Sequence, residues 1–524
     1  MLKPFLFCQL CNMKNVWCLV LLLVAGIVNA QSYNDLGLLY SRSGISGTAR
    51  SVGSASAYGS VGADLGSISI NPAGLGLYRS TDISFTPGLF INKNKADFDG
   101  TTTVGNNTKV FINQFGIAFT KLIKHENRGN NFSFNAVKLN AISFSINYQR
   151  ESMYSKTVDW SSDNTQSSAM GYFANAVNKT GMPLNTDNYP VEMVLAYQTY
   201  LLDSINGNGN FYSNVRAPIH QSGNILTKGA TDHVDLALGG NLNDKFYFGA
   251  GIGFSVLTYM QDASFSESKT NDTANHFMDY TFTSNLRNTG LGVVGKFGII
   301  YRPASWIRLG LAYHTPTFYN ITETYSGSTV ANFDTATFGQ TLEAYPFKYK
   351  LKTPMKGIAS TSFYFKEYGF LSVDYEFQNY GAMRFSFPAA FGNATSQSND
   401  FQKKYYAFGH VVRAGFEGSY KVLRVRAGYA YSSTPYKKAY VTKNYTEEKH
   451  TVSAGLGYRG KHFYVDFAYQ LGITKEPTYP YADWEVNNKL LSHTALLTIG
   501  FRIFKNTPEQ TDSKSRSAKP GMKF

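Results

Sequence analysis

Apolar and other residues alternate with a period of two over most of the chain after Asp82, which is the pattern of β-strands. In the segment WIRLGLAYH, Leu309, Leu311 and Tyr313 fall on one face, while Arg308 falls on the other. In several such segments the second face carries charges and glycines, whereas the first is unbroken and ends in aromatic residues. This pattern is typical of a transmembrane β-barrel, with lipid outside and a polar lumen inside.

The connections between the predicted strands alternate in length. Strands are predicted near residues 82–92, 109–120, 136–149, 233–242, 245–257, 290–302, 306–317, 354–365, 368–379, 408–420, 422–432, 450–459, 461–471 and 492–504. Links are very short at 243–244, 303–305, 366–367, 421 and 460, but long at 150–232, 258–289, 318–353, 380–407, 433–449 and 472–491. We therefore expect an all-β, antiparallel barrel of about 14 strands that crosses the bacterial outer membrane many times, with both ends of the barrel in the periplasm.

The amino-terminal region has the features of a secretory signal. Residues 1–30 hold an apolar run that ends in Val-Asn-Ala, which resembles a cleavage site and predicts a mature start at Gln31. A single membrane anchor is the alternative interpretation of this run. All three cysteines of the chain lie within residues 1–30, so we expect no disulfide in the mature protein. We assign residues 81–504 to the barrel and residues 505–524 to a polar, basic tail.

The link at 150–232 is long enough to hold structure of its own. Residues 188–204 place Val194, Leu195 and Leu201 near helical spacing, after a proline suited to the first turn of a helix. This apolar face could close the mouth of the barrel, or it could bind a hydrophobic ligand at the cell surface.

No catalytic or metal-binding motif emerges. The nine histidines are dispersed, and the charged residues, 16% of the chain with a net charge of +14, form no basic helix. Two G-x-G-x-x-G motifs, at 290–295 and 455–460, lie in predicted strands, whereas a dinucleotide site needs this motif to open a helix. We predict no enzyme activity, no cofactor, no metal and no nucleic-acid partner.

Residues 31–80 precede the barrel and are rich in glycine, serine and alanine. A segment so poor in large apolar residues cannot build its own core, so we predict that it forms a plug inside the barrel. The segment ends in the turn formed by Asn71, Pro72, Ala73 and Gly74, directly before the first strand. This turn is our candidate for the gate.

The Asn-Pro-Ala-Gly-Leu turn before strand one, the segment LGLAYHTP and the closing strand HTALLTIGFRIF resemble the FadL-type family of outer-membrane transporters for long-chain fatty acids and other hydrophobic compounds. The resemblance implies that Asn71, Pro72 and Ala73 form a hatch that blocks the lumen. It also implies that ligand binds between hatch and wall and leaves sideways beside a kinked third strand. That strand maps near 136–149, where the sequence holds no glycine or proline to mark a kink.

Charged residues of the predicted lumen face have two interpretations. Arg308, Arg424 and Arg426 could anchor the carboxylate of a ligand. They could instead form ion pairs with acidic residues of the same face, which fill and stiffen the lumen. Those acidic residues are Asp374, Glu376, Glu417 and Asp466.

Three functions follow from these features. The first is passive, TonB-independent uptake of hydrophobic small molecules such as long-chain fatty acids or aromatic hydrocarbons, in contact with outer-membrane lipid. The second is an interaction scaffold or shuttle barrel of a protein secretion system, with protein partners at the aromatic-rich extracellular loops. The third is a general porin.

Overall fold

The computed structural model describes residues 35–123, 138–164, 166–186, 188–205, 210–270, 276–441, 447–481 and 484–504. The signal sequence expected at residues 1–30 and the tail expected at 505–524 lie outside these ranges. Among the described residues, no helix is long and apolar enough to cross a membrane.

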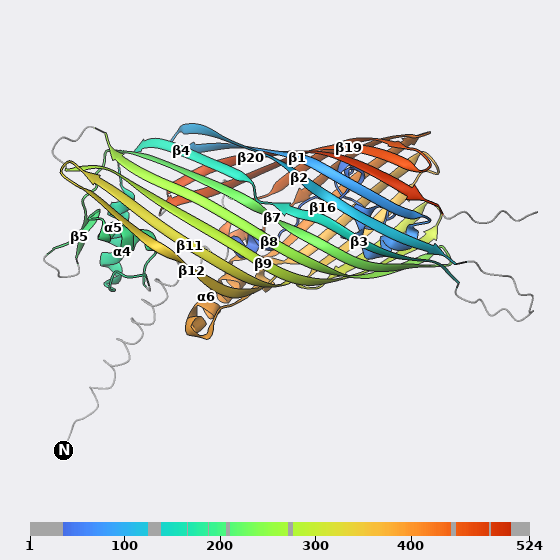
Figure 1. Cartoon of the computed structure of the whole chain (residues 1–524), viewed down its shortest axis with the longest axis horizontal. Coiled ribbons are helices and arrows are strands. Elements are labelled where there is room, and N and C mark those ends of the chain that lie inside the picture. The colour runs from blue at the N-terminus through green and yellow to red at the C-terminus, as the bar shows by residue number, and fades with distance from the viewer. Residues whose placement is uncertain are drawn as a thin grey trace, which may run out of the picture.

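The chain forms a closed antiparallel barrel of fourteen strands, as the sequence predicts (Figure 1). The spanning strands are β1 (Thr81–Phe98), β2 (Thr101–Leu122), β3 (Leu139–Met153), β7 (Ile219–Leu242), β8 (Phe246–Lys269), β9 (Phe277–Ala304), β10 (Ile307–His314), β13 (Lys356–Tyr364), β14 (Gly369–Asn379), β16 (Phe408–Tyr420), β17 (Leu423–Ser432), β18 (Lys449–Arg459), β19 (Phe463–Tyr481) and β20 (Trp484–Ile503). Pairing between β1 and β20 closes the wall. The shorter elements β4 (Lys156–Asn164), β11 (Phe318–Phe333), β12 (Thr337–Lys352) and β15 (Arg384–Ser386) extend the wall at its extracellular end.

The two faces of the wall agree with the predicted alternation. Leu309, Leu311 and Tyr313 of β10 are exposed on the outside, whereas Gly310 and His314 are buried in the lumen. The outward apolar side chains form a band next to the short turns, which on β8 runs from Phe246 to Val256. This band is the surface that meets lipid.

Several strands continue far beyond the apolar band. Strand β9 has 28 residues, and β11 and β12 each have 16. The links expected at 258–289 and 318–353 are therefore mostly strand, and the prediction of long loops there is wrong. These extensions lie above the lipid, so they lack the outward apolar stripe that identifies the spanning parts.

Helices gather at the extracellular end of the barrel, at the left of Figure 1. The helices α4 (Ala169–Thr180) and α5 (Val191–Gln198) pack with the hairpin of β5 (Leu202–Ser204) and β6 (Phe211–Ser213). The helix expected within 188–204 is thus present as α5. A further helix, α6 (Gly392–Tyr405), lies beside the barrel wall (Figure 1).

Residues 35–80, which we call the plug, lie inside the barrel, most of them in the half next to the short turns (Figure 1). Residues 36–38 reach further and contact β15 and the residues beside it. The plug contains a helical stretch at 35–41 and the short helices α2 (Ala49–Gly53), α3 (Leu65–Ile68) and η1 (Pro72–Leu77). Leu65, Ile68 and Leu75 share an apolar cluster with Ala118 and Ala237 of the wall. The plug therefore uses the barrel to complete its core.

Candidate functional site

The turn at Asn71 is a helix cap that is bonded to the rest of the plug. The Asn71 side-chain oxygen accepts a hydrogen bond from the backbone N–H of Ala73 at 3.0 Å, which caps η1, and Pro72 occupies its first turn. The side-chain amide donates to the carbonyl of Gly59 at 2.7 Å. Asparagine and proline are suited to these two positions because one supplies the cap and the other lacks an N–H that needs a partner.

Three glycines of the wall make room for this turn. Gly239, Gly249 and Gly298 lie side by side on β7, β8 and β9 and face the lumen. A Cβ atom on Gly249 would lie 2.3 Å from the Pro72 carbonyl, and one on Gly298 would lie 1.9 Å from the Asn71 side-chain oxygen. The turn is therefore seated directly against wall backbone, where any side chain would push it away.

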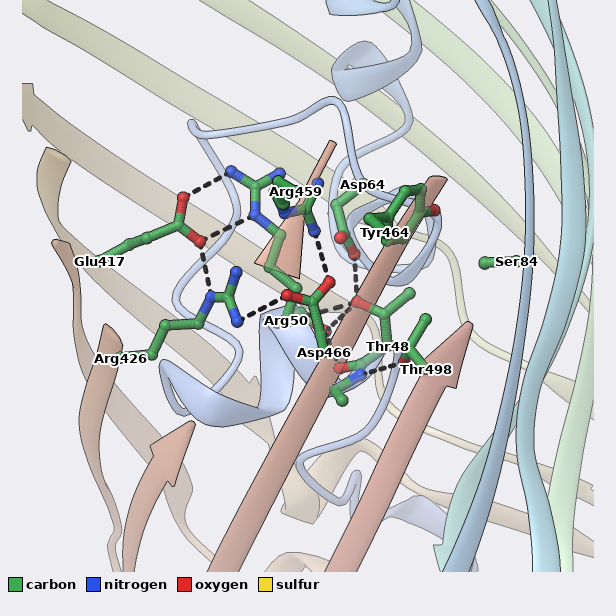
Figure 2. A network of polar contacts seen from close by, with 12 residues as sticks. Thr48, Arg50, Asp64, Ser84, Glu417, Arg426, Arg459, Tyr464, Asp466 and Thr498 are labelled. Atoms are coloured by element: carbon green, nitrogen blue, oxygen red, sulfur yellow. Dashed lines mark hydrogen bonds and ion pairs between the residues drawn. The ribbon is translucent and has the colours of Figure 1, made fainter. Parts of the chain in front are cut away.

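A buried network of ion pairs fixes α2 to the opposite wall (Figure 2). Arg50 of α2 donates from two nitrogens to Glu417, each at 2.9 Å, and Arg426 donates to the same carboxylate at 2.6 Å. Asp466 forms ion pairs with Arg426 and with Arg459, both at 2.8 Å. Three guanidinium groups thus share two carboxylates, and one of the three belongs to the plug.

The second G-x-G-x-x-G motif provides space for this network. A Cβ atom on Gly457 would lie 2.1 Å from the Asp466 carboxylate and 2.8 Å from the Arg426 guanidinium. The glycine faces the lumen on β18, so its role is to admit a buried ion pair between the two strands that flank β18.

Each predicted lumen arginine has partners within the protein. Arg308 donates to the Val61 carbonyl at 2.8 Å and to the Tyr364 hydroxyl at 2.7 Å. Arg424 donates to two carbonyls at the turn before β17, and Arg426 is fully buried in the network above. These contacts fit the interpretation in which the charged residues fill the lumen, and a role for them in ligand binding stays a prediction.

Val194, Leu195 and Leu201 lie at the other end of the molecule. Val194 and Leu195 belong to α5 and Leu201 follows it, and all three are buried. Val194 packs with Val177 of α4, while Leu201 joins a separate apolar cluster. The structure does not bring these residues together with the lumen arginines, and their binding role also stays a prediction.

A cavity of about 310 Å³ lies between residues 39–46 of the plug and the wall. One part of its lining is apolar, and this part includes Leu39, Ile45, Phe90, Phe111, Met153 and Leu490. The other part is charged and polar. An amphiphilic molecule, with an apolar body and a polar end, matches both parts of this lining.

Lys449 is a charged residue of this lining that the sequence analysis did not identify. Other charged groups of the lining are paired, for example Arg42 with Glu447 at 2.7 Å and Glu376 with Arg413 at 2.6 Å. Lys449 lines the same cavity and forms no ion pair with any residue in the described ranges. The sequence signal for Lys449 is strand alternation. Val452 faces outward on β18, and Lys449, three residues earlier, therefore faces inward.

The wall is interrupted beside this cavity. The ladder between β2 and β3 ends at the pair Gln114–Gln149, and β3 shifts register against β7 between Arg150 and Ser152. The carbonyl of Glu151 instead accepts a hydrogen bond from Gly44 of the plug at 3.1 Å. Above the interruption, Ser155 bonds to Asn107 at 2.8 Å. We call the gap between residues 108–113 and 150–154 the window.

One contact crosses the window. The Arg150 guanidinium lies 5.6 Å from the centre of the Phe111 ring and is held there by two hydrogen bonds to Asp232. Val110, beside Phe111 on the outer face, is 82% exposed. The window lies just after residues 136–149, where the resemblance implied a kinked third strand. A register shift between Arg150 and Ser152 produces the window, and no glycine or proline within 136–149 is involved.

A plugged barrel with a lipid-facing band and a cavity beside a wall interruption defines a transport protein of the bacterial outer membrane. The family model for the outer membrane protein transport protein (OMPP1/FadL/TodX) matches residues 226–493, about half of the chain. The chain belongs to this family, which consists of transport proteins and not of enzymes. No curated protein sequence matches the chain.

Solved structures are similar to the chain at low sequence identity. A FadL homologue from Pseudomonas aeruginosa is 12% identical, with a TM-score of 0.51, over 88% of this chain and 98% of that one. The toluene transporter TodX from Pseudomonas putida is 12% identical, with a TM-score of 0.47, over 84% of this chain and 95% of that one. The toluene transporter TbuX from Ralstonia pickettii is 13% identical, with a TM-score of 0.45, over 86% and 98%.

Proposed function

We propose that this protein is a passive, TonB-independent channel that takes up hydrophobic small molecules, with long-chain fatty acids as the principal class and aromatic hydrocarbons as a second. Water is a poor medium for such ligands, because each CH₂ group costs about 0.8 kcal/mol to hydrate. A plugged barrel with an apolar cavity offers a route that avoids this cost, which an open aqueous pore does not.

The observation that carries the proposal is the lining of the 310 Å³ cavity. Its apolar part suits the chain of a fatty acid, and Lys449, a lining cation that forms no ion pair with any described residue, suits the carboxylate. An aromatic hydrocarbon would use the apolar part alone. The two ligand classes therefore differ in whether they need Lys449.

The window supplies a route from the cavity into the membrane. Phe111 and Met153 line the cavity next to the window, while Val110 and Ile112 of the same strand face outward. A ligand that passes between Phe111 and Arg150 would move from the apolar part of the cavity to the lipid without entering water. The plug would stay in place during this step, because the route does not cross η1.

The test is uptake of labelled palmitate and labelled toluene by cells that lack other channels for them. The Lys449→Gln variant should reduce palmitate uptake severalfold and leave toluene uptake unchanged. Lys461→Gln, which removes the same charge from an exposed turn, is the matched control and should change neither. If Lys449→Gln takes up palmitate at the wild-type rate, the cavity does not bind the carboxylate and the proposal fails for fatty acids. Ion conductance of the intact protein in a planar bilayer would instead indicate a porin.

A further inference from the structure

Four lysines gather on the lipid-facing side of three neighbouring strands. Lys475 of β19 lies directly opposite Lys489 of β20, and Lys489 lies directly opposite Lys95 of β1. Lys93 is on the same face of β1, two residues nearer the apolar band. All four side chains are exposed, and none forms an ion pair within the described part of the chain. We call Lys95, Lys475 and Lys489 the lysine row.

The lysine row lies just above the lipid-facing band. Below it on the same outward face, the Tyr469 hydroxyl bonds to His493 at 2.7 Å. Outward tyrosines that bond to histidines recur as Tyr375–His410 and Tyr429–His450, and such amphipathic aromatic residues mark the membrane interface. His493 and Lys489 are four positions apart, about 13 Å along a strand and less in height because the strands tilt. This distance places the lysines at the level of lipid headgroups.

The arrangement is unfavourable for the isolated protein. Residues directly opposite each other in neighbouring strands have Cβ atoms about 5 Å apart, so like charges there destabilise the sheet. The central Lys489 has such a neighbour on each side. Asp97, two residues beyond Lys95 on the same face of β1, accepts a hydrogen bond from Thr102 and forms no ion pair with a lysine of the row. An anion bound to the row would remove this repulsion.

We propose that the lysine row binds the phosphate groups of an anionic lipid in the outer leaflet of the membrane. The lysines lie on the same outward face of three strands as the lipid-facing apolar residues. A lipid whose acyl chains lie against Phe467 and Leu497 therefore has its phosphates next to the lysines. Multiple phosphates on one glycolipid headgroup match three cations in a line. The site is separate from the transport cavity, because its residues face the opposite side of the wall.

The test uses the full-length protein, delipidated in a neutral detergent, with bisphosphorylated lipid A as the probe and native mass spectrometry as the readout. The variant Lys95→Gln/Lys475→Gln/Lys489→Gln should bind the probe at least about tenfold more weakly than the wild type. The matched control, Lys366→Gln/Lys421→Gln/Lys461→Gln, removes three exposed lysines from turns at the periplasmic end and should bind as the wild type does. Equal loss in both variants would overturn the proposal.

Two further measurements identify the source of the phosphate and distinguish a loss of binding from misfolding of the variant. Dephosphorylated lipid A should bind the wild type and the row variant equally, and millimolar inorganic phosphate should not displace the bisphosphorylated probe. Displacement by inorganic phosphate would mean that the row is a site for soluble anions, which overturns the lipid assignment. Lys489→Gln alone should raise the melting temperature in lipid-free detergent at low salt, because it removes two like-charge contacts. A fall would contradict the repulsion on which the proposal rests.

Discussion

Arg50 is the plug residue whose removal should most weaken the attachment of α2 to the wall. Its side chain is 14% exposed and that of its partner, Glu417, is 4% exposed, so the pair is largely shielded from water. Breaking a buried ion pair costs roughly 3–5 kcal/mol. Because Glu417 keeps Arg426 as a partner, we take the lower end, about 3 kcal/mol, for Arg50→Met. This corresponds to an increase of more than about a hundredfold in the population of undocked α2.

Hydrogen exchange of the α2 amides, residues 49–53, measures this population directly. Arg79→Gln is the matched control, because Arg79 also joins the plug to the wall, through Asp244, but with side chains that are 44% and 50% exposed. An exposed pair contributes at most about 1 kcal/mol, so exchange should rise by about fivefold or less. Equal exchange of α2 in Arg50→Met and in the control would refute the conclusion that the buried network holds the plug.

Three other variants probe the window, the seat of the turn and the extracellular helices. Phe111→Ala removes the ring beneath Arg150 and should raise uptake of toluene by cells; unchanged or lower uptake would mean that this contact does not limit passage. Gly298→Val places atoms where the Asn71 side chain lies, so it should displace η1 and raise ion conductance in a planar bilayer. Gly171→Val, at an open position, is the control and should not raise the conductance. An unchanged conductance in Gly298→Val would contradict the close packing of the turn against the wall. Burial raises the pKa of Glu267, which bonds to the start of α4 above the lipid-facing band. Its contribution to stability is therefore full below the ordinary pKa of a glutamate and is lost as the pH rises through the raised value. Protection factors of α4 should fall over this interval in the wild type and stay level in Glu267→Gln; a parallel fall in both would exclude Glu267 as the cause.

The barrel was predictable from the sequence because contact with lipid requires apolar residues on one face of each spanning strand. Leu309, Leu311 and Tyr313 had to face outward, which fixed Arg308 and His314 as lumen residues. Strand segments outside the lipid are not required to carry apolar residues on their outer face. The extensions β11 and β12 have no apolar face of this kind, so their strands could not be told from loops.

The candidate site was only partly predictable, for a geometric reason. The inward direction of Arg426 follows from alternation, but its pairing with Glu417 and Asp466 depends on the register between strands and on the position of the plug. The glycines opposite Asn71 are separate in sequence and meet only when β7, β8 and β9 pair. The window likewise depends on a register shift, and no residue between 136 and 149 predicts that shift.

In the proposed route, a hydrophobic ligand occupies the cavity between plug and wall and leaves through the window. Photolabelling of the intact protein in outer membranes with a diazirine derivative of palmitic acid, followed by mass spectrometric mapping, tests this claim most directly. We expect labels at residues 111–113 and 150–155, and weaker labelling when unmodified palmitate competes. Labels confined to η1 and the short periplasmic turns would show an axial route through the plug and would contradict it.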